Sequence, residues 1–209
     1  MNLYIRNATA RPEKMLDALA FATEIATQVT TTTGLEVTPW STVYGAPLGT
    51  LSWSARVASQ AEIAKFGDQL LADAKYVETL EGAIELFAAP AEDTVSEIVT
   101  FAGSGGNAGE YAAVVVAQCA DGRMADAMAW AVDIMNHVSS VTGQDVTLVR
   151  GLYGPFATLA WITMAETIEQ VDAGTAAIAA DSTYIDKIDS AADLFVPGAT
   201  TSRLVRRLS

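Results

Sequence analysis

The chain has 209 residues, of which 51% are hydrophobic and 18% charged, and its formal net charge is −13. This composition is typical of a compact folded protein and excludes a disordered one. The negative charge repels nucleic-acid backbones and anionic lipids, so we expect neither as a partner.

The sequence predicts neither a membrane crossing nor a secretory signal. Residues 37–55 are uncharged, but they contain two prolines and two glycines, which would interrupt a spanning helix. Residues 1–13 carry Arg6 and Arg11 and lack the apolar segment of a signal peptide. We therefore expect a cytoplasmic protein.

Taken in chain order, the first half predicts a β-α-β-β-α-β succession. Apolar residues recur three and four positions apart from Pro12 to Thr33, which indicates a helix, and Gly34 ends it. A Gly/Pro turn at 45–49 separates two stretches typical of antiparallel strands. The predicted elements are strand 2–10, helix 12–33, strands 35–44 and 50–58, helical segments within 60–87 with a break near 73–75, and strand 94–101.

The second half repeats the first. Residues 15–45 match 124–154 at a shift of 109, and residues 50–87 match 158–195 at a shift of 108. Such a long period indicates a whole domain copied once. We predict a first repeat at 1–101, a Gly/Ser linker at 102–109 and a second repeat at 110–209. The second repeat is predicted to contain strand 111–119, helix 123–141, strands 145–153 and 157–165, helices within 168–195, and strand 202–208.

The order β-α-β-β-α-β is that of the ferredoxin-like arrangement, whose two helices cover one face of the sheet. The other face should alternate to polar if water reaches it, yet residues 112–117 are apolar throughout. Both faces are therefore expected to be buried. We predict an α+β fold in which two tandem ferredoxin-like repeats pack sheet-to-sheet as one pseudo-dimeric α/β barrel.

Four segments carry a family resemblance. They read YGAPLGTL at 44–51 and AIELF at 83–87, with the second copies YGPFATL at 153–159 and AADLF at 191–195. With the repeated β-α-β-β-α-β order, the chain resembles the dimeric α/β-barrel superfamily in a tandem fused form, and within it NIPSNAP-like members. The resemblance implies a barrel, but the superfamily includes monooxygenases, polyketide cyclases, haem proteins and proteins without a known reaction, so it selects no function.

Aromatic residues near the strand ends are candidates for ligand binding. Tyr44 and Tyr153 each end a strand immediately before a turn glycine, where a phenol can orient a ligand or simply cap the core. Trp40 breaks the internal symmetry, because its counterpart is Val149. Asymmetry of this kind is expected if only one copy keeps a ligand site.

Arginines in predicted strands are the second set of candidates. Alternation allows Arg6 to point into the barrel, and Arg56 and Arg150 also lie in strands. A buried guanidinium needs an acid or an anionic ligand. Glu36 and Glu97 are candidate acids, so internal ion pairing and binding of an anion both remain open.

No catalytic residue, metal ligand or cofactor site is predicted. His137 is the only histidine and Cys119 the only cysteine, and no His/Cys/carboxylate spacing suits a metal. His137 corresponds to Gln28 on a predicted outer helix, which favours a structural polar residue over a general base. A lone cysteine in an apolar run is typical of core packing.

Three function classes remain open. The first is a small-molecule-binding α/β barrel with little or no catalysis, whose apolar lumen and few arginines accept an apolar or anionic ligand. The second is a cofactor-independent monooxygenase or polyketide-cyclase-like enzyme, which needs no metal motif. The third is a structural component that forms homo-oligomers, because acids gather in predicted helices and arginines in strands.

Overall fold

A computed structural model describes residues 1–104 and 109–209. The described chain divides into two compact units, the first formed by Met1–Ser96 with Arg206–Ser209 and the second by Glu97–Val205. The division falls within the last strand of each repeat. The domain limits at 101 and 110 stay a prediction, and residues 105–108 of the predicted linker lie outside the described residues.

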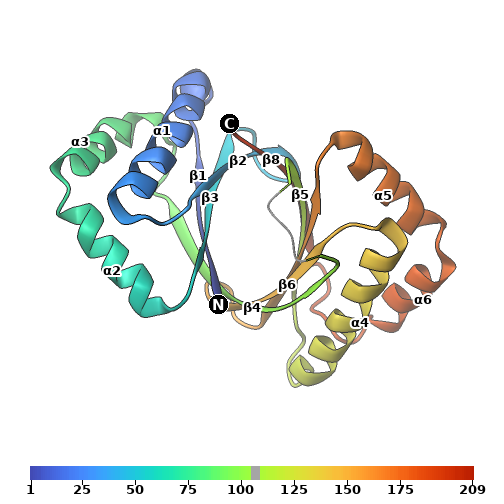
Figure 1. Cartoon of the computed structure of the whole chain (residues 1–209). Helices are drawn as coiled ribbons and strands as arrows, with labels where there is room; N and C mark the ends of the chain where they lie inside the picture. The colour runs from blue at the N-terminus through green and yellow to red at the C-terminus, as the bar shows by residue number, and fades with distance from the viewer. Residues whose placement is uncertain (105–108) are drawn as a thin grey trace. The chain divides into compact units, whose positions relative to one another are not determined.

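The first repeat has the predicted β-α-β-β-α-β order (Figure 1). A 3-10 turn at Pro12–Lys14 precedes its first helix, and a second at Ile84–Leu86 follows its last helix. The other elements are β1 Asn2–Thr9, α1 Met15–Thr33, β2 Thr38–Tyr44, β3 Thr50–Val57, α2 Gln60–Leu71, α3 Ala74–Ala83 and β4 Glu92–Ala102.

The second repeat has the same order. Its elements are β5 Tyr111–Gln118, α4 Met124–Thr142, β6 Val146–Tyr153, β7 Thr158–Ala165, α5 Ile168–Ala180, α6 Ser182–Ser190 and β8 Thr201–Arg207.

The described strands hydrogen-bond in the order β1-β3-β2-β8-β5-β7-β6-β4, and this order closes into a barrel. In the first repeat β3 pairs antiparallel with both β1 and β2, and in the second β7 pairs in the same way with β5 and β6. The predicted fold class, an α+β barrel of tandem ferredoxin-like repeats, is confirmed.

Local sequence explains where the helices begin and end. The Ser59 side chain accepts a hydrogen bond from the Glu62 backbone N–H, and the Glu62 carboxylate accepts one from the N–H of Ala58, the residue before the cap, which is a variant of the capping box at the start of α2. Thr167 and Gln170 form the same box at the start of α5. The long helices α1 and α4 end at Gly34 and Gly143, which adopt left-handed conformations.

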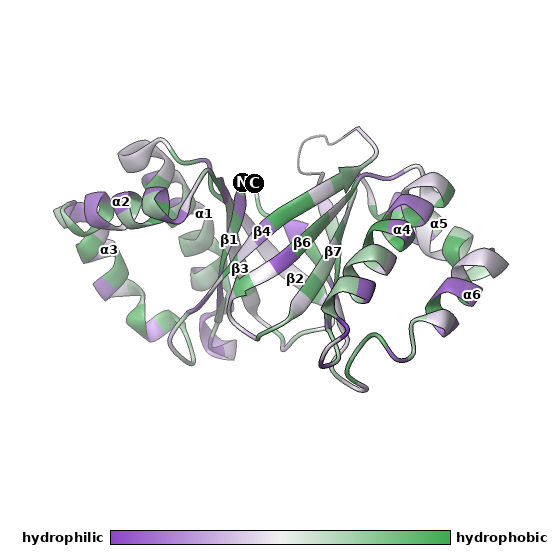
Figure 2. Ribbon diagram, turned by 90° about the horizontal axis from the view of Figure 1, so that it is seen from below, coloured by the Kyte–Doolittle hydropathy of each residue, from purple (hydrophilic) through white to green (hydrophobic). Residues whose placement is uncertain are grey.

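The helices of each unit lie over one face of its strands (Figure 1). Small side chains let α1 approach the sheet closely, because Ala18, Ala22 and Ala26 are all buried. Figure 2 shows that α2 and α6 carry hydrophilic as well as hydrophobic residues, as expected of helices with one face in solvent. Among the described helices, none has the length and apolarity that crossing a bilayer requires.

Candidate functional site

An aromatic triad joins the helices to the sheet in the first unit. Phe21 of α1, Trp53 of β3 and Phe87 pack edge-to-face, with ring centroids 5.7–6.4 Å apart. The Trp53 indole N–H donates to the Ala22 carbonyl of α1 at 2.9 Å. Trp53 is therefore a buried anchor between a strand and a helix.

The second unit has an aromatic triad at the same three positions, with Trp130 in place of Phe21. Trp130 of α4, Trp161 of β7 and Phe195 pack edge-to-face at 5.4–6.0 Å. The Trp161 indole N–H donates to the Ala131 carbonyl at 3.0 Å. The two copies have thus kept the same attachment of sheet to helix.

Beside each triad lies a cavity between the sheet and its helices. The cavity of the first unit has a volume of about 410 Å³ and that of the second about 460 Å³. Apolar residues dominate both linings. Examples are Phe21, Ile25, Val29, Ile63, Phe66 and Leu70 in the first unit, and Ile134, Val138, Val146, Val171, Ile178 and Ile188 in the second.

The lining of the first cavity includes a polar cluster, which we call the Tyr4–Arg6–Asp93 cluster. The Arg6 Nε and Nη2 groups donate to the two carboxylate oxygens of Asp93 at 2.7 and 2.8 Å, so the pair is bidentate. The Arg6 guanidinium carbon lies 6.0 Å from the centre of the Tyr4 ring. Tyr76, which is buried, also lines this cavity.

The surroundings shift the pKa of each member of this cluster. Burial raises the pKa of Tyr4 above its usual range, so the phenol stays protonated. The hydrogen bond to Asp93 raises the pKa of Arg6. Burial also acts to raise the pKa of Asp93, but the hydrogen bonds and charge of Arg6 outweigh it, and the net pKa is below the usual value. The cluster therefore holds a protonated phenol and a closed ion pair.

The second cavity has no such cluster. At the shift of 109, Tyr4 and Arg6 correspond to Ala113 and Val115, which line the second cavity. At the shift of 108, Asp93 corresponds to Thr201. None of the described residues that line the second cavity is charged.

Arg6 lies on the face of its sheet that was not expected. Its cross-strand partner is Trp53, whose indole contacts α1, and cross-strand partners point to the same face. Arg6 therefore faces the helices of its own unit, and its acid is Asp93 rather than Glu36 or Glu97. The alternation of side chains along a strand defines two faces of the sheet, but it does not show which face the helices cover. The expected orientation of Arg6, into the barrel, was therefore wrong.

The aromatic candidates lie elsewhere. Trp40 is buried on the sheet face opposite to Trp53, and its indole N–H donates to the Ser54 hydroxyl at 2.8 Å. Tyr44 and Tyr153 are exposed at the ends of β2 and β6. None of these three residues lines either cavity.

The remaining arginine candidates are also outside the two cavities. Arg56 is exposed near the end of β3. The Arg150 guanidinium donates to Glu97 at 2.5 Å, and both side chains are 43% exposed. Of the predicted ligand-binding residues, only Arg6 lines the first or the second cavity.

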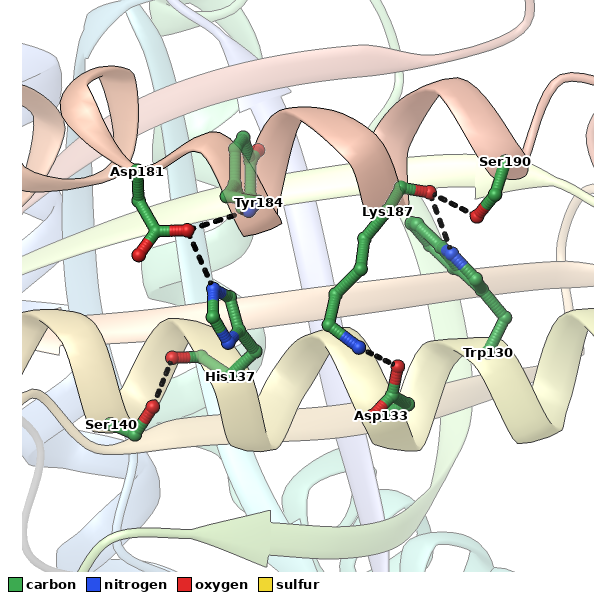
Figure 3. A network of polar contacts seen from close by, with 8 residues as sticks. All are labelled: Trp130, Asp133, His137, Ser140, Asp181, Tyr184, Lys187 and Ser190. Atoms are coloured by element: carbon green, nitrogen blue, oxygen red, sulfur yellow. Dashed lines mark hydrogen bonds and ion pairs between the residues drawn. The ribbon is translucent and has the colours of Figure 1, made fainter.

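His137 belongs to a set of contacts that joins α4 to α6 (Figure 3). Its Nε2 lies 3.0 Å from an oxygen of Asp181, which also caps α6 by accepting from the Tyr184 N–H. The same two helices are joined where Trp130 donates to the Lys187 carbonyl and Lys187 pairs with Asp133. His137 lies outside the lining of the second cavity, and its setting agrees with the structural interpretation.

Metal chemistry finds no support in the part of the chain that the structure describes. No group of three or more His, Cys, Asp or Glu side chains there could hold an ion. Cys119 is buried, and burial raises the pKa of its thiol, which keeps it protonated and unreactive.

Comparisons with known proteins identify the fold. No protein-family model matches the chain, and no curated protein matches it. A "putative monooxygenase" from Fusobacterium nucleatum subsp. nucleatum shares 8% identity over 100% of this chain and 92% of its own, with a TM-score of 0.72. The fold is that of a tandem dimeric α/β barrel.

Two further solved structures have this tandem barrel fold. An "anthrone oxidase-like protein" shares 14% identity over 100% of this chain and 92% of its own, with a TM-score of 0.70. A "putative monooxygenase" from Lactobacillus acidophilus NCFM shares 9% identity over 100% and 94%, with a TM-score of 0.66. At these identities the likeness shows the fold alone.

Sequence reasoning missed Asp93 and Tyr76 as cavity residues. Tyr76 was visible as an identity of the repeat, because it corresponds to Tyr184, which lines the second cavity. Asp93 lies 87 residues from Arg6 in the chain, so nothing local signals the pair. If the repeat is extended past Phe87 at the same shift, Asp93 aligns with Thr201. This alignment shows that only the first copy has a carboxylate at that position.

Proposed function

We propose that this protein binds apolar small molecules in the cavities between the sheet and the helices of its two units. The observation that carries this is the presence of cavities of about 410 and 460 Å³ at equivalent places beside equivalent aromatic triads. Both volumes lie within the range of roughly 300–1,000 Å³ that is typical of ligand pockets.

The chemistry of the first cavity favours binding over turnover. A general base works best when its pKa is close to the working pH. The pKa of Asp93 is lowered and that of Tyr4 is raised, so neither side chain exchanges a proton readily near neutrality. These groups suit the positioning of a ligand.

A cofactor-independent monooxygenase is the second candidate. It is favoured by the names of the similar structures, two described as a "putative monooxygenase" and one as an "anthrone oxidase-like protein". Oxygen consumption in the presence of anthrone tests it. Consumption that needs the folded protein, and that is abolished by Arg6→Val, would replace binding by catalysis as the function.

Other expectations remain proposals. These are a cytoplasmic location, a NIPSNAP-like relationship within the superfamily and self-association through segregated charge. Native mass spectrometry of the full chain addresses the last, because it reports copy number together with any retained small molecule.

A cavity-filling variant tests the proposed function. Gly67 lines the first cavity, and a Cβ added there meets nothing within 4 Å, so Gly67→Leu should occupy the space without a clash. Gly82 in α3 has equally open surroundings but lines neither cavity, which makes Gly82→Leu the matched control. Both changes replace a helical glycine, so both should favour the helix by about 0.5–1 kcal/mol.

The readout is the number of probe molecules bound, with 2-ethylnaphthalene as the probe and isothermal titration calorimetry as the measurement. We expect two sites per chain in the natural sequence and in Gly82→Leu, and one in Gly67→Leu. Absence of any saturable binding by the natural sequence would refute the proposed function.

A further inference from the structure

A third hollow adjoins the first cavity along β1. We call it the outer compartment; its volume is about 480 Å³, and it lies between β1 and the segment 83–91. Tyr4 and Arg6 line the first cavity, whereas Arg6 and Ala8 line the outer compartment. Alternate residues of a strand point to the same face, so the two spaces follow one another along β1 and meet at Arg6.

The second unit has one continuous cavity at the corresponding place. Alternate residues of β5 line it over about 13 Å of strand, and these are Ala113, Val115 and Ala117. At the shift of 109 they correspond to Tyr4, Arg6 and Ala8. The second cavity is therefore longer than the first, although its volume of about 460 Å³ is similar.

The far end of the second cavity corresponds to the outer compartment. Its lining there includes Phe195, Val196 and Pro197. At the shift of 108 these residues are the counterparts of three that line the outer compartment, Phe87, Ala88 and Ala89. One long cavity in the second unit thus takes the place of two shorter spaces in the first.

The position of Arg6 explains the division. Besides Arg6, the first cavity and the outer compartment share three residues, Phe21, Trp53 and Leu80. Their counterparts in the second lining are as large or larger, namely Trp130, Trp161 and Ile188. Of the four shared positions, only that of Arg6 has a much smaller residue in the second unit, Val115.

Asp93 and Tyr4 hold the Arg6 side chain at this position. The guanidinium donates to both carboxylate oxygens of Asp93 at 2.7 and 2.8 Å, and a bidentate pair fixes its orientation. The Tyr4 hydroxyl is also hydrogen-bonded to Asp93. The paired side chains are 39% and 43% exposed, and an apolar chain that crossed them would remove this remaining contact with water.

We infer that the Arg6–Asp93 pair is a barrier to ligand length, and that the second unit binds a longer aliphatic chain than the first. A chain in the second cavity gains affinity along its whole length, whereas a chain in the first gains none beyond the barrier. The outer compartment alone binds weakly, because residues 88–91 of its lining are exposed and a short ligand there stays wet. This inference rests on the proposed function, since it concerns the ligands of the same cavities.

Two linear alcohols with the same head group, 1-hexanol and 1-dodecanol, test it by isothermal titration calorimetry. Each methylene that is buried should increase affinity about fourfold. The measured quantity is the ratio of the dodecanol affinity to the hexanol affinity at each site. We expect this ratio to be at least about tenfold smaller at the first cavity, which corresponds to two methylenes left outside. Gly67→Leu retains only the second cavity and so identifies its ratio.

Arg6→Val removes the barrier, because it gives the first unit the residue of the second. The ratio at the first cavity should rise at least about tenfold, and any change that affects both alcohols equally cancels in the ratio. Arg150→Val is the matched control. It also removes a strand arginine from an ion pair of similar exposure, and Arg150 lines none of these three spaces. Its ratios should equal those of the natural sequence.

The reverse exchange tests the same barrier in the other unit. Val115→Arg with Thr201→Asp places an arginine and an acid at the corresponding positions of the second unit. In the Gly67→Leu background, where the second cavity is measured alone, this exchange should lower the ratio at least about tenfold. Circular dichroism of each variant establishes that it is folded before its affinities are compared.

The outcomes separate the two proposals. Equal ratios at the two sites of the natural sequence would overturn the inference, and so would an Arg6→Val ratio that stays at the natural value. In both cases saturable binding of 2-ethylnaphthalene would leave the proposed function standing. If neither the alcohols nor 2-ethylnaphthalene binds, the proposed function fails and the inference fails with it.

Discussion

The two units have the same architecture. Their side chains differ mainly at positions that do not hold the sheet to its helices. Each keeps an aromatic triad and an indole hydrogen bond from strand to helix. The wall of the cavity has diverged, with Tyr4 and Arg6 in one unit and Ala113 and Val115 in the other. After a duplication, positions that hold the sheet to its helices stay fixed by packing, and positions that face a cavity are free to change.

A second contrast concerns the last helix of each repeat. In the second unit, α6 is joined to α4 by His137, Asp133 and Trp130 (Figure 3). In the first unit, the corresponding contact runs from the Thr32 hydroxyl to Asp73 at 2.8 Å. Gln28, the counterpart of His137, has a carboxamide whose buried nitrogen and oxygen find no hydrogen-bond partner among the described residues.

Removal of a triad indole should have the largest effect. We expect Trp53→Ala to lower the free energy of unfolding by about 3–5 kcal/mol, because a buried indole and its hydrogen bond are lost together. Trp161→Ala should cost less, since Trp161 is only partly buried. Urea denaturation followed by circular dichroism measures both. A smaller loss for Trp53 than for Trp161 would show that burial of the indole does not decide the cost.

Removal of the helix caps should come next. Asp73 accepts from the Lys75 and Tyr76 N–H groups, and Asp181 accepts from the Tyr184 N–H. Each Asp→Ala change should lower the free energy of unfolding by about 0.5–2 kcal/mol. Asp→Asn at the same positions is the control, since asparagine also caps helices, and it should recover most of the loss in thermal denaturation.

Exchange of the cavity walls should change affinity rather than stability. The variant Tyr4→Ala, Arg6→Val, Asp93→Thr gives the first unit the side chains of the second at these three positions. It should bind 2-ethylnaphthalene about 2- to 12-fold more tightly at this site than the natural sequence does, because an apolar ligand then covers no ion pair. Calorimetric titration checks this. An unchanged affinity would show that the ion pair keeps its contact with water when the ligand binds.

The smallest expected effect is the pH dependence of the α4–α6 contacts. The hydrogen bond from His137, followed by that from the Tyr184 N–H, lowers the pKa of the Asp181 carboxyl in the folded protein. A carboxyl with a depressed folded pKa stabilises the fold above its unfolded pKa of about 3.9, and this contribution is lost as the pH falls through the folded value.

His137→Gln should therefore raise the pKa of Asp181 toward its usual value. The variant should be less stable than the natural sequence above about pH 4, and the difference should shrink on acidification below that. Carboxyl chemical shifts followed by NMR against pH measure the pKa directly. An unchanged Asp181 pKa in the variant would show that the backbone N–H groups, rather than His137, set it. Gln28→His, which places a histidine opposite Asp73, is the reciprocal change.

Most of the fold followed from patterns that are local or periodic. Helical spacing from residue 12 to 33 predicted α1 with its end at Gly34, and the repeat predicted the second copy. The break near 73–75 marks the boundary between α2 and α3, because Asp73 begins a new helix there. The main differences are at strand ends. Strand β2 starts at Thr38 rather than residue 35, and β4 starts at Glu92 rather than residue 94.

The candidate site was only partly predictable. Arg6 was correctly singled out as an arginine that needs an acid, since the cost of an unpaired guanidinium is a property of the residue itself. The identity of that acid was not predictable, because Asp93 lies in a different strand and is separated from Arg6 by most of a domain. The exposed Tyr44 and Tyr153 looked equally plausible from their positions before turn glycines.

The sequence by itself determined the order of elements, the duplication and the buried character of the strands, because each of these depends on residue type and spacing. Only the tertiary structure decided which sheet face the helices cover, and therefore that Arg6 and Tyr4 line a cavity beside α1 while Trp40 lies on the opposite face. A strand has two faces related by simple alternation, and only packing between distant segments makes one of them a binding wall.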